Sequence, residues 1–418
     1  MNRRKVLWFI NKVPRAVART VGTPGARGGW LDSYIEIIGA EPGIELTVAF
    51  PDSSERAGEL KIDGVNYAGL PTWEPASAVG RVISRWRRNV APPHVVAAAA
   101  RLIRDVGPDL IHLHGAEYCY GLAVSGSGVP TILSVQGSPT AIRRFYLRGV
   151  DRHFLRSLSL GSLLKGRGPV HYHARMKVQA ANEKAVMASI DHVAGRTEWD
   201  RRFASVMAPQ AAYHHCDEPM RRAFYEVTWH PATARPGRIV CTSGDYALKG
   251  VGTLLRAVDI LRRTVPEASL VIVGVLPGDE GQRATLRHAR ALGIEDRVTL
   301  AGEVDAATLA CLLTEASVFV NPSHFENSSN ALCEAQLVGV PCVASSAGGL
   351  VTLAAHGSAA LLFQDGDEQA LAGAILSLLR DPDEAARLGA RGQMLAAARH
   401  DRSSIRAQIL SIYDETVG

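Results

Sequence analysis

Two glutamates, Glu326 and Glu334, are separated by seven residues in the stretch of this chain that is richest in candidate chemistry. Before them, residues 317–321 are short, apolar and β-branched, which predicts a buried parallel strand. Good N-cap residues then lead into the run 331–338, which is helix-forming and apolar on one face. We therefore expect Glu326 on the loop before a helix and Glu334 within the first turns of that helix.

The N-terminus of this helix is an expected anion site. Its free N–H groups favour a negatively charged group, and the residues at the expected start are Ser328, Ser329, Asn330 and Ala331. Carboxylates beside a bound phosphate would repel it, unless they hold the hydroxyls of an attached sugar and ribose instead. The combination predicts a nucleotide-sugar site. The alternative is an ordinary surface helix with two solvated acids.

A lysine, Lys249, is the second candidate for anion binding. It follows an expected strand at 239–242 and stands just before a helix whose buried stripe begins at Val251. A lysine beside free backbone N–H groups can neutralise a diphosphate. The alternative is a solvated loop lysine.

The segment around Glu326 and Glu334 resembles the Glu-x7-Glu region of retaining glycosyltransferases of the GT-B fold, in the large family 4 group. In that family the first glutamate lies against the donor sugar and diphosphate, and the second holds the ribose hydroxyls. The resemblance implies these roles for Glu326 and Glu334, diphosphate contact for Lys249, and nucleobase contact through the backbone near Gly302. It implies transfer of a hexose-type sugar from a nucleoside diphosphate to an acceptor hydroxyl, with no cofactor besides that co-substrate.

Three positions depart from the family pattern. Gly244 stands where the family usually has an arginine, and Thr352, shortly after Gly348 and Gly349, stands where it often has a glutamate. Gln136 stands where the family commonly has a histidine, and a glutamine cannot carry a proton at neutral pH. In the family's proposed front-face route the leaving phosphate accepts the acceptor's proton, which makes Gln136 tolerable.

The first half of the chain offers further candidate contacts. Gly28 and Gly29 resemble the glycine-rich loop that faces the donor phosphate and the acceptor, although a plain flexible loop fits nearly as well. His112 and His114 alternate to one side of an expected strand, so we expect a sugar or acceptor contact there or a pair of structural histidines. Arg196, at another strand end, suits a phosphate. For this arginine we favour a ligand contact over a structural ion pair.

No metal site is expected. Asp365 and Asp367 have the Asp-x-Asp spacing that holds a cation in metal-dependent glycosyltransferases of the other major fold. However, Asp367 directly precedes a helix with an acidic first turn, which predicts an N-cap instead. Lys249 and a helix N-terminus already supply positive charge at the diphosphate.

Strands and helices alternate along the whole chain, which predicts an α/β fold of two facing Rossmann-like domains with parallel sheets. The pattern is interrupted by a proline-rich stretch at 231–237. We therefore predict an acceptor-side domain at 1–230 and a nucleotide-sugar-binding domain at 231–398. In the family that this chain resembles, the last helix crosses back to the first domain. We expect residues 399–418 to do the same. Ligands of open α/β sheets bind beyond the carboxyl ends of the strands, so a cleft between the domains is expected.

Composition narrows the partners and the compartment. The chain has 418 residues, a net charge of +5 and six scattered cysteines without a Cys-x-x-Cys pair. The scattered cysteines suggest free thiols in a reducing compartment. The modest net charge and the lack of a zinc-binding cysteine pattern exclude a typical nucleic-acid binder. No run is long enough to span a bilayer, so we expect a cytoplasmic protein. Residues 142–167 combine many arginines with apolar residues, which suggests either a solvated basic segment or contact with the inner face of an anionic membrane.

The predicted function is therefore retaining transfer of a sugar to an acceptor glycan, glycolipid or small-molecule glycoside, as in cell-surface polysaccharide, lipid-linked or natural-product synthesis. One alternative is a sugar-nucleotide epimerase or a phosphorylase on the same fold. Another is a non-catalytic subunit that binds nucleotide sugars, an alternative that the three departures leave open. The sequence names neither the base, the sugar nor the acceptor.

Overall fold

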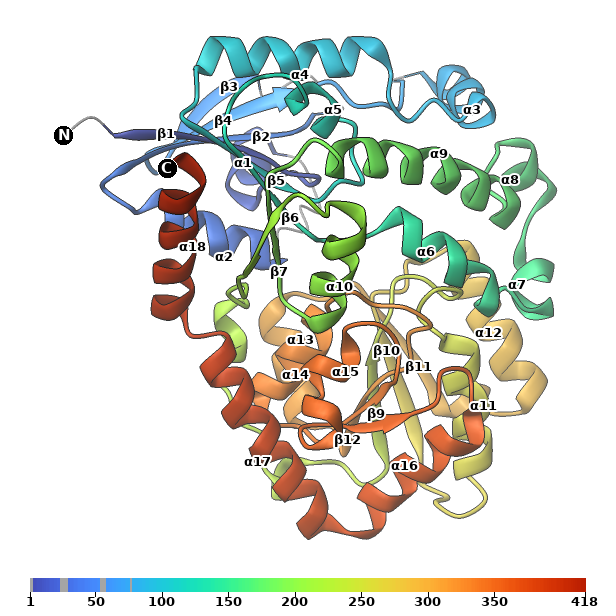
Figure 1. Cartoon of the computed structure of the whole chain (residues 1–418). Coiled ribbons are helices and arrows are strands. Elements are labelled where there is room, and N and C mark those ends of the chain that lie inside the picture. The colour runs from blue at the N-terminus through green and yellow to red at the C-terminus, as the bar shows by residue number, and fades with distance from the viewer. Residues whose placement is uncertain (1–2, 23–28, 53–57, 76) are drawn as a thin grey trace. The chain divides into compact units, whose positions relative to one another are not determined.

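The computed structural model describes residues 3–22, 29–52, 58–75 and 77–418. The chain divides into two compact units, each built around one sheet (Figure 1). The N-terminal unit consists of residues 1–143, 164–219 and 400–418, and the C-terminal unit of residues 144–163 and 220–399. The α/β prediction is confirmed.

The sheet of the N-terminal unit has eight strands in the order β3-β4-β2-β1-β5-β6-β7-β8. Neighbouring strands are parallel, except that β3 pairs antiparallel with β4. The strands are β1 (Arg4–Phe9), β2 (Ile44–Pro51), β3 (Glu59–Ile62), β4 (Val65–Leu70), β5 (Leu110–His114), β6 (Thr131–Ser134), β7 (His192–Gly195) and β8 (Ala212–His215).

Helices cover both faces of this sheet because side chains alternate along each strand. On one face, Val6 and Trp8 of β1 pack with helices α2 and α18. On the other face, Leu7 and Phe9 of β1 pack with helices α4 and α10. The helices of this unit are α1 (Arg15–Val21), α2 (Gly29–Gly39), α3 (Ala78–Arg87), α4 (Pro93–Val106), α5 (Gly121–Val124), α6 (Pro139–Phe145), α9 (Pro169–Met187), α10 (Glu198–Met207) and α18 (Arg402–Val417).

The sheet of the C-terminal unit has six parallel strands in the order β11-β10-β9-β12-β13-β14. The strands are β9 (Arg238–Thr242), β10 (Ser269–Val273), β11 (Val298–Gly302), β12 (Val318–Asn321), β13 (Cys342–Ser345) and β14 (Leu361–Phe363). The helices are α7 (Arg152–Ser157), α8 (Leu160–Leu164), α11 (Val251–Leu261), α12 (Glu280–Leu292), α13 (Ala306–Thr314), α14 (Asn330–Val338), α15 (Leu350–Leu353), α16 (Glu368–Arg380) and α17 (Pro382–Arg399).

The boundary predicted at 231 is wrong, because the chain passes into the C-terminal unit at 219–220. Residues 220–230 already pack there: the backbone N–H of Trp229 donates to Val338 O at 2.7 Å, and its indole donates to Ala316 O at 2.7 Å. Proline content marked a loop, but buried apolar and hydrogen-bonding groups decide which unit a segment joins.

Residues 144–163 are a second departure from the predicted domains, because they belong to the C-terminal unit. Phe154 of α7 lies in the core of that unit and stacks on Tyr246 with ring centroids 5.8 Å apart. The basic segment 142–167 is thus broken into short helices, most of which pack with the C-terminal unit. Within the described ranges, no helix combines the length and the apolar character needed to cross a bilayer.

The last helix, α18, belongs to the N-terminal unit, as the resemblance implied. Tyr413 is fully buried, and its hydroxyl accepts a hydrogen bond from the indole of Trp8 at 2.8 Å. The same hydroxyl lies 2.8 Å from Nδ1 of His112 in β5. α18 is therefore fixed by polar as well as apolar contacts.

Candidate functional site

The strand β12 and the helix α14 form the predicted strand-loop-helix. Ser329 is the N-cap of α14, where its Oγ accepts from the backbone N–H of Leu332 at 3.3 Å and from Asn321 Nδ2 at 2.7 Å. The first helical residue is Asn330, followed by Ala331. Ser328 Oγ is buried and has no hydrogen-bond partner within the part of the chain that the structure describes. A buried polar atom without a partner at a helix N-terminus is a plausible ligand contact.

Lys249 and Glu326 lie together at this site, although 77 residues separate them in the sequence. The ammonium group of Lys249 forms an ion pair with Glu326 Oε1, and Ser323 Oγ donates to the same oxygen at 3.1 Å. The two side chains keep 29% and 12% of their surface exposed, so a ligand can reach them. A cation and a carboxylate that hold each other in this way are pre-positioned for a substrate that carries both phosphates and hydroxyls.

Two glycines hold these loops in place. Gly250 has φ +65°, and a Cβ there would collide with the carbonyl oxygen of Pro322, the residue directly after β12. Gly348 has φ +55°, and a Cβ there would collide with Glu326 O. The backbone N–H of Gly349 donates to that same oxygen at 2.8 Å. The small residues at 348 and 349 thus allow a close approach to the Glu326 backbone.

Replacing Gly250 with alanine is expected to destabilise the protein by about 1–3 kcal/mol, because a left-handed conformation and a collision coincide there. Donor affinity should fall as well, since the Lys249 loop must move. Gly293→Ala is the matched control: Gly293 has φ +67°, but a Cβ there meets nothing within 4 Å. Chemical denaturation measures both variants, and equal destabilisation would contradict the importance of the Pro322 contact.

Glu334 lies on α14 and is buried, with both carboxylate oxygens bound by one arginine. Arg221 Nε donates to Oε1 and Arg221 Nη2 donates to Oε2, each at 2.8 Å. Burial raises the pKa of Glu334, and the guanidinium of Arg221 opposes that rise. Each carboxylate oxygen has a second lone pair, so the group can still accept hydroxyl hydrogen bonds. Arg221 was not predicted, because it belongs to no motif and follows the last strand of the N-terminal unit.

Gly302 ends β11 with φ +68° and open space beside its Cα. Its carbonyl accepts from the backbone N–H of Gly274 at 2.6 Å, which ties the ends of β10 and β11 together. Lys249 and Glu326 follow the carboxyl ends of strands in one parallel sheet, and Gly302 is the last residue of another strand of that sheet. This edge is where ligands bind in open α/β folds. The predicted donor residues of the C-terminal unit therefore share one edge.

Arg148 is a cation near this edge that we did not predict. It donates to Asp365 Oδ2 at 3.0 Å and lies 4.7 Å from the ring centroid of Phe145, which stacks on Phe325. Phe325 directly precedes Glu326. Segment 144–163 thus brings a positive charge to the loop that carries Glu326.

The Asp-x-Asp pair is occupied by structural contacts. Asp365 Oδ1 lies 2.6 Å from Nδ1 of buried His324, and its other oxygen binds Arg148. Asp367 is the N-cap of α16, as predicted, and accepts from the backbone N–H of Ala370 at 2.8 Å. The two carboxylates therefore have separate local roles.

The histidines predicted in the N-terminal unit are buried. His112 Nδ1 lies against Tyr413 and Nε2 lies 2.7 Å from Ser134 Oγ, and burial lowers its pKa to about 3. His114 stacks on His112 with ring centroids 3.9 Å apart. This is the arrangement of structural histidines, which was the alternative to a ligand contact. Gly29 begins α2 with φ +53°, whereas Gly28 lies outside the described residues.

Arg196 and Gln136 meet at one buried carboxylate, Glu218. Arg196 Nη1 lies 3.0 Å from Glu218 Oε2, and Gln136 Nε2 donates to Glu218 Oε1. Arg196 is 6% exposed and Glu218 5%, so the pair is buried. The geometry is that of the structural ion pair, the reading that we had favoured less for Arg196.

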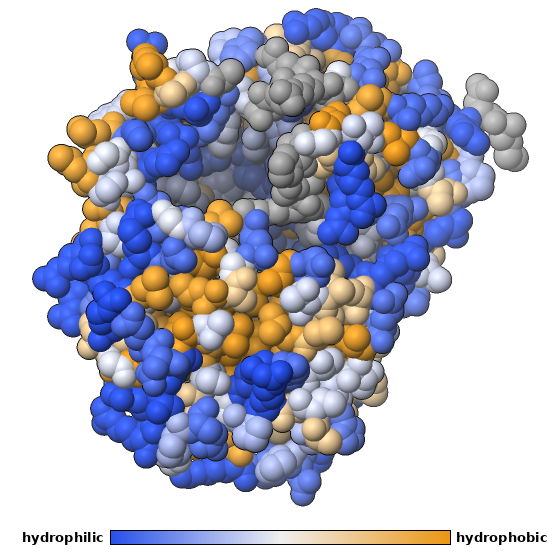
Figure 2. Space-filling view, turned by 180° about the vertical axis from the view of Figure 1, so that it is seen from behind, coloured by the Kyte–Doolittle hydropathy of each residue, from blue (hydrophilic) through white to orange (hydrophobic). Residues whose placement is uncertain are grey.

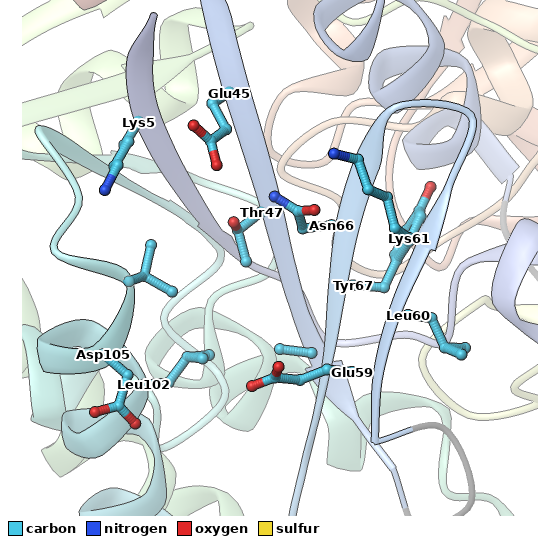
Figure 3. A pocket seen from close by; sticks show the side chains of 12 residues that line it. Lys5, Glu45, Thr47, Glu59, Leu60, Lys61, Asn66, Tyr67, Leu102 and Asp105 are labelled. Atoms are coloured by element: carbon cyan, nitrogen blue, oxygen red, sulfur yellow. The ribbon is translucent and has the colours of Figure 1, made fainter.

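A separate hollow of about 440 Å³ lies on the N-terminal unit (Figure 3). Its lining mixes lysines with carboxylates around β1 to β4: Lys5, Glu45, Thr47, Glu59, Lys61, Asn66 and, from α4, Asp105. Lys5, Glu45 and Asn66 stand at the amino ends of their strands, the edge opposite to the one that binds ligands in this fold class. We therefore exclude this hollow from the candidate site.

The C-terminal unit resembles known proteins. Residues 237–381 match the family model described as glycosyl transferases group 1. A D-inositol 3-phosphate glycosyltransferase of Thermobispora bispora is 35% identical over 176 residues, 41% of each chain. A GDP-mannose-dependent α-(1-6)-phosphatidylinositol monomannoside mannosyltransferase of Mycobacterium tuberculosis is 30% identical over 226 residues, 50% of this chain and 57% of that protein. The chain thus matches 41% to 57% of the length of these relatives.

Solved structures resemble the whole chain. Sucrose-phosphate synthase of Thermosynechococcus elongatus superposes with a TM-score of 0.73 at 18% identity, covering 99% of both chains. HepE of Anabaena, solved with UDP and glucose, gives a TM-score of 0.66 at 18% identity, covering 99% of this chain and 100% of that one. At such identity the likeness shows the fold alone. Residues 237–381 of the C-terminal unit therefore resemble glycosyl transferases group 1, and the chain has the GT-B fold with two Rossmann-like sheets.

Proposed function

We propose that this chain is a retaining glycosyltransferase that moves a sugar from a nucleoside diphosphate to an acceptor hydroxyl. The observation that carries the proposal is the pairing of Lys249 with Glu326 beside the N-terminus of α14, where Ser328 Oγ is buried without a partner among the described residues. A diphosphate suits the cation and the helix end, and a sugar suits the carboxylate.

The barrier to transfer lies in breaking the bond between the sugar's anomeric carbon and the diphosphate oxygen. Negative charge develops on that oxygen while the sugar becomes oxocarbenium-like. Lys249 and the backbone N–H groups at the N-terminus of α14 stabilise the developing charge. Glu334 holds the ribose hydroxyls, and the leaving phosphate accepts the proton of the acceptor hydroxyl. No histidine at position 136 is then required.

The names of relatives suggest the donor class. One relative is GDP-mannose-dependent, and two of the similar structures contain UDP. We infer a nucleoside diphosphate hexose as donor, with GDP-mannose and UDP-hexoses as the first to test. The acceptor is inferred to be a glycan, a glycolipid or a small-molecule glycoside.

The test is a thermal-shift panel of nucleoside diphosphates and their sugars, followed by transfer assays with each stabilising donor. We expect one base to stabilise the protein, and the product to keep the anomeric configuration of the donor. An inverted product contradicts retention. Donor binding without transfer or slow donor hydrolysis favours the non-catalytic subunit, and epimerised donor or sugar phosphate favours the other two alternatives.

Transfer is expected to continue without a divalent metal. Lys249 and the N-terminus of α14 supply positive charge, while Asp365 is engaged by Arg148 and His324 and Asp367 caps α16. Activity is measured after exhaustive chelation, with and without added magnesium or manganese. Loss on chelation that metal restores, and that Asp365→Asn with Asp367→Asn abolishes, would overturn this expectation.

We further infer a cytoplasmic protein with peripheral contact to the inner face of a membrane. Segment 142–167, which first suggested that contact, is largely packed into the C-terminal unit, although Leu147, Leu155 and Leu160 remain exposed. Residues of the N-terminal unit support a membrane contact better.

A further inference from the structure

The helix α3 of the N-terminal unit keeps an apolar face outside the core. Val79, Ile83 and Trp86 recur at helical spacing, and none of the ten residues of α3 is buried. Val79 is 70% exposed. A surface helix of a globular protein normally turns such a stripe inward, so an exposed stripe calls for an external contact.

The last residue of α8 and the start of α9 extend this apolar face. The indole of Trp86 donates to Leu164 O at 2.9 Å and meets the ring of His171 edge-on at 4.3 Å. Leu164 is exposed, and Val170 at the start of α9 is 74% exposed. We call Val79, Ile83, Trp86, Leu164 and Val170 the α3 ridge. Figure 2 shows the molecule of Figure 1 from behind, and hydrophobic residues lie among hydrophilic ones at its upper left, on the side of α3.

A basic pocket of about 190 Å³ adjoins the α3 ridge. It is lined by Glu74, Arg85, Gly166, Arg167, His171, Tyr172 and Arg175. Three guanidinium groups therefore meet one carboxylate, and Arg85 already engages that carboxylate through two nitrogens at 3.2–3.3 Å. Arg175 lies over the rings of Tyr172 and Trp73, and its Nε is buried without a hydrogen-bond partner in the described ranges.

The surroundings of the ridge carry the same sign of charge. Arg87, Arg88 and Lys165 are exposed, and Arg81 is half-buried on α3. An apolar ridge rimmed by cations, with an indole at its base and an unsatisfied guanidinium in an adjoining pocket, is complementary to a surface with an apolar interior and an anionic boundary.

We propose that the α3 ridge and the basic pocket form a docking site for anionic phospholipid. The ridge enters the acyl boundary of the bilayer, and Arg167 and Arg175 bind a headgroup phosphate. The site lies wholly within the N-terminal unit, whereas the predicted donor residues Lys249, Glu326 and Glu334 belong to the C-terminal unit. The proposal does not depend on the proposed transfer reaction.

The test is co-sedimentation with vesicles of phosphatidylcholine alone or mixed with phosphatidylglycerol. Wild-type protein is expected to bind the mixed vesicles, to be released by salt and to leave the neutral vesicles unbound. The ridge variant Val79→Ser with Ile83→Ser and the pocket variant Arg167→Gln with Arg175→Gln should each bind at least about tenfold more weakly. Circular dichroism and thermal melting confirm that each variant is folded, and Arg167→Gln alone provides a milder pocket variant.

Matched controls lie on the same unit. Val206→Ser removes another exposed valine, 78% exposed on α10, and Arg104→Gln removes an exposed arginine on α4. Both should bind like the wild type. Equal binding by the ridge variant, or equal binding to neutral vesicles, overturns the proposal.

Two further probes distinguish other occupants. One outcome is that inorganic phosphate stabilises the wild type and the ridge variant equally while neither protein binds vesicles. That result would indicate a free-phosphate site and overturn the proposal. An acidic peptide bound equally by both proteins, again without vesicle binding, would indicate a protein partner and do the same. Donor hydrolysis in the same samples keeps the two proposals separate, since its absence counts only against the transferase.

Discussion

Lys249→Ala is expected to lower kcat of sugar transfer by about 100- to 1000-fold, the usual cost of removing one electrostatic donor from an active site. The charge on Lys249 is needed most when the diphosphate leaves, so donor affinity should change less than turnover. Steady-state kinetics with saturating donor measures the effect, and thermal melting shows that the variant is folded. Lys184→Ala, which removes an exposed lysine of α9, is the control and should keep wild-type turnover.

The ion pair with Glu326 allows a sharper test. The double variant Lys249→Ala with Glu326→Ala should recover the stability that the single variant loses, because no carboxylate is left unpaired. We expect turnover of the double variant to stay low. Wild-type turnover in folded Lys249→Ala would remove this residue from the catalytic site.

Glu334→Ala is expected to weaken donor binding strongly. Each hydrogen bond between a ribose hydroxyl and a carboxylate is worth roughly 1.5–3 kcal/mol, which corresponds to about tenfold or more in affinity. The variant also leaves the guanidinium of Arg221 without its partner. Calorimetry with the free nucleoside diphosphate and with the sugar donor should show the same loss, since both carry the ribose. Unchanged affinity for both would exclude Glu334 from the site.

Arg221 variants separate the binding role of Glu334 from its fold role. Burial raises the pKa of Glu334 and Arg221 lowers it, so loss of the guanidinium raises that pKa further. The carboxylate is then protonated at a higher pH as the solution is acidified. Donor affinity of Arg221→Met should therefore begin to fall at a higher pH than in the wild type, and Arg221→Lys should restore part of it. Identical pH profiles would contradict this coupling.

Local patterns were sufficient to predict the fold class and the strand-loop-helix that carries Glu326 and Glu334. The apolar run of β12, the cap at Ser329 and the helical face of α14 are encoded within about twenty consecutive residues, and capping and periodicity act over that range. The cap at Asp367 was predictable for the same reason.

Contacts between distant residues could not be predicted from those patterns. Arg221 meets Glu334 across 113 residues, and His112 meets Tyr413 across 301 residues. For the same reason, neither the pairing of Arg196 with Glu218 nor the packing of segment 144–163 in the C-terminal unit could be predicted. A single sequence indicates which helices and strands have an apolar or a polar face, but the packing of the whole chain decides which side chains meet. Local sequence therefore determined the donor loop, and only the tertiary structure decided which charges support it and which residues are buried in structural roles.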